Sequence, residues 1–173
     1  MATTIVERTI PSISEAEPDT TLSRLVRGVV AGEISGAVFA LVTVWFTTSI
    51  GLTGDAAFLM MSTIAKGGGQ VDASSDVATG VLVHLALSAL FGAIFALILP
   101  KMRTNGTLLL SAGVYGLVVY LVNFRILSPV FFPAFQDANQ PFEVLVHLVY
   151  GQLLAVFFLS RGVRRGEPRF DWR

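Results

Sequence analysis

Four apolar runs, each about as long as a bilayer's hydrocarbon core is thick, constrain the fold of this chain more than any other feature. They cover residues 26–50, 78–99, 107–127 and 142–160. A helix needs about 20 apolar residues to cross that core. The composition agrees, with 53% hydrophobic residues, 14% charged residues and a mean hydropathy of +0.70. The runs therefore predict an all-α, polytopic membrane protein with a bundle of four transmembrane helices.

The two ends of the chain differ from this apolar part. Residues 1–22 are polar and lack the apolar middle of a cleavable signal peptide, so we expect a disordered N-terminal tail. Residues 23–160 form the predicted transmembrane domain, and residues 161–173, with five arginines, form a basic tail. Ser23 is the expected cap of the first helix, and Pro129 is the expected end of the third.

Charge predicts the orientation of the helices. Ten of the twelve basic residues fall on one side of the predicted spans, and only Lys66 and Arg125 fall on the other. Basic residues concentrate on the cytoplasmic side of inner-membrane proteins. We therefore expect a multi-pass protein of the cell inner membrane with both termini in the cytoplasm. The ten residues are Arg8, Arg24, Arg27, Lys101, Arg103, Arg161, Arg164, Arg165, Arg169 and Arg173.

A pentapeptide occurs twice in the chain. Residues 81–85 and 144–148 both read Val-Leu-Val-His-Leu, which aligns the second and fourth runs at an offset of 63 residues. The first and third runs align less well, at an offset of 80. These offsets predict that the bundle is built from two duplicated helical hairpins, residues 26–99 and 107–160. Because both hairpins start on the same side, an axis along the membrane normal would relate them.

Small residues recur at four-residue spacing in every run. Such stripes let membrane helices approach closely, where packing drives their association. We expect these glycines to pack the helices of the bundle. A second interpretation is that the stripe on the first run contacts another protomer or a larger membrane complex. The glycines are Gly28, Gly32, Gly36, Gly92, Gly116 and Gly151.

The repeated histidines, His84 and His147, are the strongest candidates for a site, because ionisable groups inside a bilayer are costly and usually functional. Both lie on small-residue stripes and should face the bundle interior. One interpretation is structural hydrogen bonding to neighbouring helices. Another is a haem b with two axial imidazoles, because two histidines at equal depth suit one iron. The remaining alternatives are proton handling, a metal site, and binding of a lipid or quinone headgroup.

Other polar residues of the runs are secondary candidates. Glu33 is expected to pair with Arg24, Arg27 or Gln152. Arg125 is expected either to pair with Asp137 or Glu143 or to extend its side chain to the membrane–water interface. Two outer segments are also unusual. Residues 56–65 are apolar but too short to span, which favours an interfacial or re-entrant segment. The Phe- and Pro-rich residues 131–142 should lie in the headgroup layer or cap the bundle, and a partner surface is the further alternative. The polar candidates are Glu33, Ser88, Asn123, Arg125 and Gln152.

Several classes of function lack their sequence signatures. The chain has no cysteine for a disulfide or thiolate metal site, and no Gly-x-Ser-x-Gly or phosphate-binding loop. A net charge of zero gives no attraction to nucleic acid. We therefore predict a non-enzymatic membrane protein without an obligatory cofactor, acting as an accessory or assembly component of a membrane complex. A haem b electron-transfer protein is the first alternative, and a small transporter or channel is the second.

Three motifs in the second half resemble a known family. They are Tyr-Leu-Val-Asn-Phe at 120–124, Phe-Pro-Ala-Phe at 132–135 and His-Leu-Val-Tyr-Gly at 147–151. Together with the segment that begins at His84, they are similar to a family of small, uncharacterised four-helix bacterial inner-membrane proteins. The resemblance covers about residues 80–160. It implies a membrane fold and no particular activity.

Overall fold

The computed structural model describes residues 20–159, and every regular element in that range is helical. Three helical stretches are long and apolar enough to cross a membrane: α1 (Thr21–Ser49), α3 (Val77–Ile98) with the short η1 (Leu99–Lys101), and the stretch Asn105–Phe131. The prediction of an all-helical protein with apolar helices of membrane-spanning length is confirmed for three of the helices. The basic tail and nearly all of the predicted N-terminal tail lie outside the described residues.

The third stretch contains three elements: α4 (Asn105–Tyr120), the π-helix η2 (Leu121–Leu127) and α5 (Ser128–Phe131). Pro129 was therefore wrongly predicted to end this helix. It lies in the first turn of α5, where proline is tolerated because the backbone N–H that it lacks would have no helical partner. Asn105 and Gly106 form the first turn of α4, which Thr104 caps.

The fourth apolar run folds as α6 (Gln140–Val156), which has 17 residues. At 1.5 Å per residue it is about 25 Å long, somewhat less than the roughly 30 Å hydrocarbon core. Two shorter elements complete the fold, α2 (Ala56–Ala65) and η3 (Pro133–Asp137). They correspond to the two outer segments that the sequence singled out.

Side-chain caps fix where the helices begin. Thr20, rather than Ser23, caps α1 by accepting a 3.1 Å hydrogen bond from the Ser23 amide. Asp76 caps α3 and Asn139 caps α6, each accepting from the amide three residues further on. Such caps satisfy backbone donors that the first helical turn leaves unpaired. Asp76 and Asn139 are separated by 63 residues, the same offset as the two histidines.

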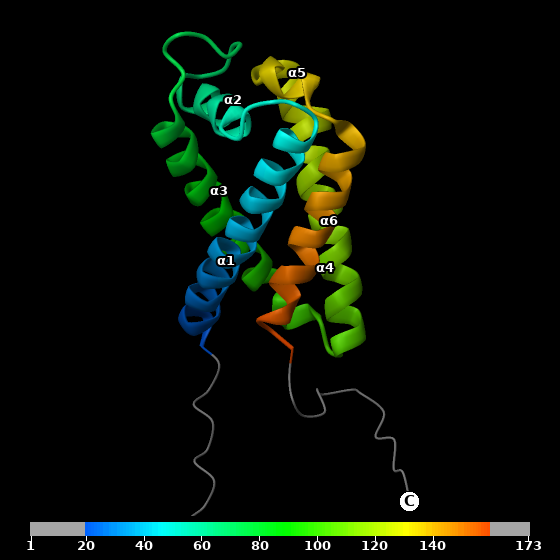
Figure 1. The fold of residues 1–173 in the computed structure, drawn as a ribbon. Helices are drawn as coiled ribbons and strands as arrows, with labels where there is room; N and C mark the ends of the chain where they lie inside the picture. Colours follow the sequence, from blue (N-terminus) through cyan, green and yellow to red (C-terminus); the bar gives the residue numbers. More distant parts are fainter. Residues whose placement is uncertain (1–19, 160–173) are drawn as a thin grey trace, which may run out of the picture.

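The helices are arranged with α1 and α6 in the centre. α1 packs against α3 and α6, α6 packs against α4, and α3 and α4 make few contacts with each other. In Figure 1, α2 and α5 lie together at one end of the molecule, and both ends of the described chain lie at the opposite end. The elements at the end with α2 and α5 thus close over the long helices.

The predicted packing glycines lie at two helix crossings. In the first hairpin, a Cβ added to Gly32 would collide with the Ser88 carbonyl oxygen, and one on Gly92 would collide with that of Gly28. In the second hairpin, the Gly151 position meets the Ala112 carbonyl oxygen. The stripe on α1 is therefore used within the chain, against α3. Gly36 and Gly116 lie at the same two crossings, beside Ser88 and His147.

Candidate functional site

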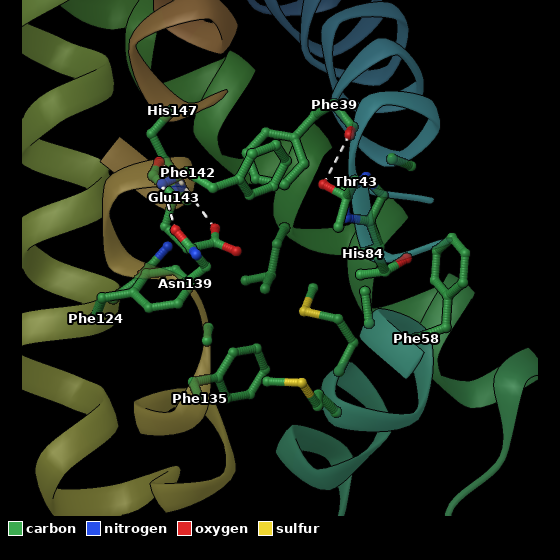
Figure 2. Close-up of a pocket in the computed structure, with 18 of the residues that line it drawn as sticks. Phe39, Thr43, Phe58, His84, Phe124, Phe135, Asn139, Phe142, Glu143 and His147 are labelled. Atoms are coloured by element: carbon green, nitrogen blue, oxygen red, sulfur yellow. Dashed lines mark hydrogen bonds and ion pairs between the residues drawn. The ribbon is translucent and has the colours of Figure 1, made fainter. Parts of the chain in front are cut away.

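A cavity of about 630 Å³ lies between the first hairpin and the second, at the end of the molecule that carries α2 and η3. Residues from α1, α2, α3, α4, η2, η3 and α6 form its wall. The wall is mostly apolar and rich in aromatic rings, with two methionines, Met60 and Met61, and Figure 2 shows several of the aromatic rings facing a common space. The aromatic lining residues are Phe39, Phe46, Phe58, Phe91, Phe124, Phe132, Phe135, Phe142 and Tyr150.

The two repeated histidines face this cavity from α3 and α6. His84 Nε2 lies 2.9 Å from the carbonyl oxygen of Gly36 on α1. His147 Nδ1 lies 2.7 Å from the carbonyl oxygen of Glu143, one turn earlier on α6. The two imidazoles therefore have different partners, although they occupy equivalent places in the pentapeptide.

Phe39 of α1 packs against both imidazoles. Its ring centroid lies 6.0 Å from that of His84 and 4.9 Å from that of His147. Axial ligation of one iron would place the two imidazole nitrogens about 4 Å apart on opposite faces of a porphyrin, taking metal–nitrogen lengths near 2 Å as a guide. Phe39 would have to leave its position to admit the porphyrin, so the described arrangement does not fit a haem.

Glu143 is the main polar residue of the site that the sequence did not propose as functional. Its side chain lines the cavity, and the residue is only 8% exposed. Oε2 lies 3.7 Å from His147 Nδ1, too far for a hydrogen bond, and the carboxylate has no closer polar partner among residues 20–159. The available signal was its position four residues before His147, which places both side chains on one helix face.

The π-helix η2 supplies a further part of the wall. π-helical segments are rare and occur frequently at functional sites. Asn123 and Phe124 of this segment both line the cavity. The Phe124 ring also packs edge-on against His147, with centroids 5.5 Å apart. Asn123 was a candidate from sequence, whereas no sequence signal identified the π-helix.

The remaining predicted polar residues fall into two groups. Ser88 lines the cavity, and its carbonyl oxygen accepts a 3.3 Å hydrogen bond from Tyr150. Glu33, Arg125 and Gln152 do not line it. None of the expected pairs forms within residues 20–159: Gln152 donates to the Leu109 carbonyl oxygen, and neither Glu33 nor Arg125 has an ion pair there. The structure therefore brings together His84, His147, Ser88 and Asn123, and adds Glu143.

A metal ion has no evident site in the described part of the chain. Within residues 20–159, no three histidine, aspartate or glutamate side chains are close enough to hold one. The chemistry that the cavity offers is therefore apolar and aromatic contact, with a small number of hydrogen-bonding groups on the walls formed by α3, η2 and α6.

Comparison of the chain with known protein families, with curated proteins and with solved structures finds no match. The resemblance to small four-helix inner-membrane proteins therefore stays a prediction from the quoted motifs.

Proposed function

We propose that the protein is a non-enzymatic, four-span protein of the inner membrane that binds one small apolar molecule in the cavity between its two hairpins. Both termini would lie in the cytoplasm, so that α2, η3 and the cavity would belong to the outer half of the bilayer. The positive-inside distribution of arginine and lysine supports this orientation.

Three observations support the fourth span and the duplication. α6 packs along α1 and α4, and the apolar run to which it belongs continues to residue 160. The caps Asp76 and Asn139 stand 63 residues apart. The close contact of Gly32 with Ser88 has its counterpart between Ala112 and Gly151, at the offsets of 80 and 63 that the sequence repeat requires.

The observation that carries the functional proposal is the cavity itself. Ligand sites for small molecules have volumes of about 300–1,000 Å³ and mostly apolar walls with a few polar groups. This cavity has about 630 Å³ and combines aromatic walls with His84, His147 and Glu143. α3 and α4 make few contacts with each other, and both contribute to the wall, α3 through several residues that include Phe91 and α4 through Val119. Entry between these two helices would suit a molecule that arrives from the lipid.

Ligand binding is compatible with the accessory role in a membrane complex that the sequence suggests. The α1 stripe, however, packs against α3, and the basic tail lies outside residues 20–159, so a docking surface for such a complex has no support in the described part. The transporter alternative would require a polar path from Glu33 to the histidines. Glu33 does not line the cavity. We therefore favour a binding protein.

Equilibrium binding of tritiated decylbenzene to the protein in nanodiscs tests this proposal. Empty nanodiscs correct for partition into lipid. We expect saturable binding of one molecule per chain. Replacing Leu87 of the cavity wall by tryptophan should abolish that binding, because the larger side chain occupies the space of the ligand.

The matched control is Leu90→Trp, three residues further along α3, where the side chain is exposed on the outer surface of the helices. It should bind decylbenzene as the wild type does. Binding that does not saturate above the lipid background, or that is equal in the two tryptophan variants, would contradict the proposed function.

A further inference from the structure

We infer that the ligand carries a hydroxyl group, which donates a hydrogen bond to an imidazole nitrogen in the cavity, and that the molecule is a phenol-like or quinol-like lipid. This inference rests on the proposed function. It concerns only the polar end of the ligand. The two backbone hydrogen bonds of the histidines carry it.

Each histidine has one ring nitrogen whose role is fixed by its partner. Carbonyl oxygens accept hydrogen bonds and cannot donate them. His84 Nε2, next to the Gly36 oxygen, and His147 Nδ1, next to the Glu143 oxygen, must therefore carry hydrogen. In a neutral imidazole the other nitrogen then has a free lone pair. His84 Nδ1 and His147 Nε2 are thus both hydrogen-bond acceptors, and neither has a partner among residues 20–159.

The surroundings of His147 favour the neutral imidazole. The residue is 5% exposed, and a charge buried to this degree requires a partner with good hydrogen-bonding geometry. The closest carboxylate oxygen, Glu143 Oε2, is 3.7 Å away, and the nearer contact of Nδ1 is the 2.7 Å bond to a carbonyl oxygen. Tyr120 also packs on the ring, and its hydroxyl donates a 3.0 Å hydrogen bond to Gln140 Oε1 rather than to the imidazole. The aromatic neighbours of the ring are Phe39, Tyr120 and Phe124.

The polar wall therefore offers acceptors that lack donors. The Glu143 carboxyl group also lines the cavity, without a hydrogen-bond partner in the described part of the chain. A ligand hydroxyl that donates to one of the two imidazole nitrogens adds a hydrogen bond to the apolar contacts of the cavity and so gains affinity. A metal ion could also use these lone pairs, but no three suitable side chains converge within residues 20–159. A hydroxyl group supplies a neutral donor for them, and the aromatic walls favour a ring to carry it.

A matched pair of probes separates a donor from an acceptor. 4-Decylphenol and its methyl ether, 4-decylanisole, share the ring, the chain and the oxygen, and only the phenol can donate a hydrogen bond. Binding of both to the protein in nanodiscs is measured by displacement of tritiated decylbenzene. We expect the phenol to bind about two- to tenfold more tightly than the ether, which is the usual net gain from one hydrogen bond.

The double variant His84→Phe/His147→Phe keeps two rings in the wall and removes both acceptors. It should bind phenol and ether about equally, with the affinity for the ether within about twofold of wild type. Leu145→Phe, on the exposed face of α6, is the control and should keep the preference for the phenol.

The wild-type comparison decides the inference even if the double variant does not fold. Equal affinities of the wild type for phenol and ether, or tighter binding of the ether, would overturn the hydroxyl inference and leave the binding function standing. If decylbenzene, phenol and ether all fail to bind above the lipid background, the proposed function falls together with the inference.

Discussion

Replacing Gly92 by alanine should separate the two helices of the first hairpin. A Cβ on Gly92 would lie 2.7 Å from the Gly32 Cα atom and 2.9 Å from the Gly32 nitrogen, and it would also collide with the Gly28 carbonyl oxygen. All three are backbone atoms of α1, so no side-chain rotation relieves the contact. The 2.7 Å contact must lengthen by about 0.7 Å to reach the 3.4 Å of ordinary van der Waals contact.

The energetic cost follows from this displacement. A gap of about 0.5–1 Å removes roughly a quarter to a half of the dispersion energy of the contacts that it opens. Overpacking of a close-packed site typically costs about 1–3 kcal/mol, and the higher helix propensity of alanine returns at most about 1 kcal/mol. The polar contacts of the crossing, including the one between His84 and the Gly36 carbonyl oxygen, would also be disturbed. We expect a net loss of about 1–3 kcal/mol.

Unfolding in mixed micelles titrated with dodecyl sulfate, followed by circular dichroism, measures this loss. Gly106→Ala is the control, because its Cβ would meet only the Thr104 hydroxyl at 3.7 Å, which is ordinary contact. That variant should be as stable as the wild type, or more stable by up to about 1 kcal/mol. The reasoning is refuted if Gly92→Ala unfolds at the wild-type midpoint, or if both variants lose stability equally.

Three further predictions concern topology, the outer loop and haem. A cysteine at Ala73 should react with an impermeant thiol reagent in intact cells and one at Gly106 should not, whereas the reverse pattern would overturn the orientation. The Ser74 hydroxyl and amide, together with Lys66, lower the pKa of Asp72 to about 2. An NMR titration should therefore show the Asp72 carboxyl protonating near pH 2. The contact between Asp72 and Lys66 should be present above that pH and lost below it. Ser74→Ala should raise this pKa toward 3.8, and an unchanged midpoint would contradict the assignment. Protein purified from cells with ample haem should lack the spectrum of a low-spin haem, because Phe39 packs on both imidazoles. A Soret band in the wild type that is lost in His84→Ala and in His147→Ala would refute this prediction.

The sequence predicts those features of the fold that depend on local composition. The length of each apolar run locates a long helix, because spanning length is a property of one helix. The four-residue spacing of small side chains locates a crossing such as that of Gly32 with Ser88, because this packing involves only one pair of helices. Helix ends are less accurate. Pro129 reads as a stop, yet the π-helix before it lets the chain begin a new helical turn at Ser128.

The site depends on contacts between distant segments, which the sequence does not specify. Both histidines were recognisable from the repeat, but their different hydrogen bonds depend on how α1 lies against α3 and how Phe39 enters between the rings. Glu143 reads as a polar residue near the start of a helix. Its burial follows from the packing of α6 beside α1, where Phe142 stacks on Phe46 with centroids 3.9 Å apart.

Native mass spectrometry of the protein extracted from its own membrane in a mild detergent tests the central claim, that the cavity holds a ligand, most directly. The wild type and Leu90→Trp should each retain one small molecule per chain after the detergent is removed in the gas phase, and Leu87→Trp should not. Fragmentation of the released molecule should reveal a hydroxyl group on a ring. Wild-type protein that carries no bound molecule, or a bound molecule that Leu87→Trp retains equally, would contradict the account.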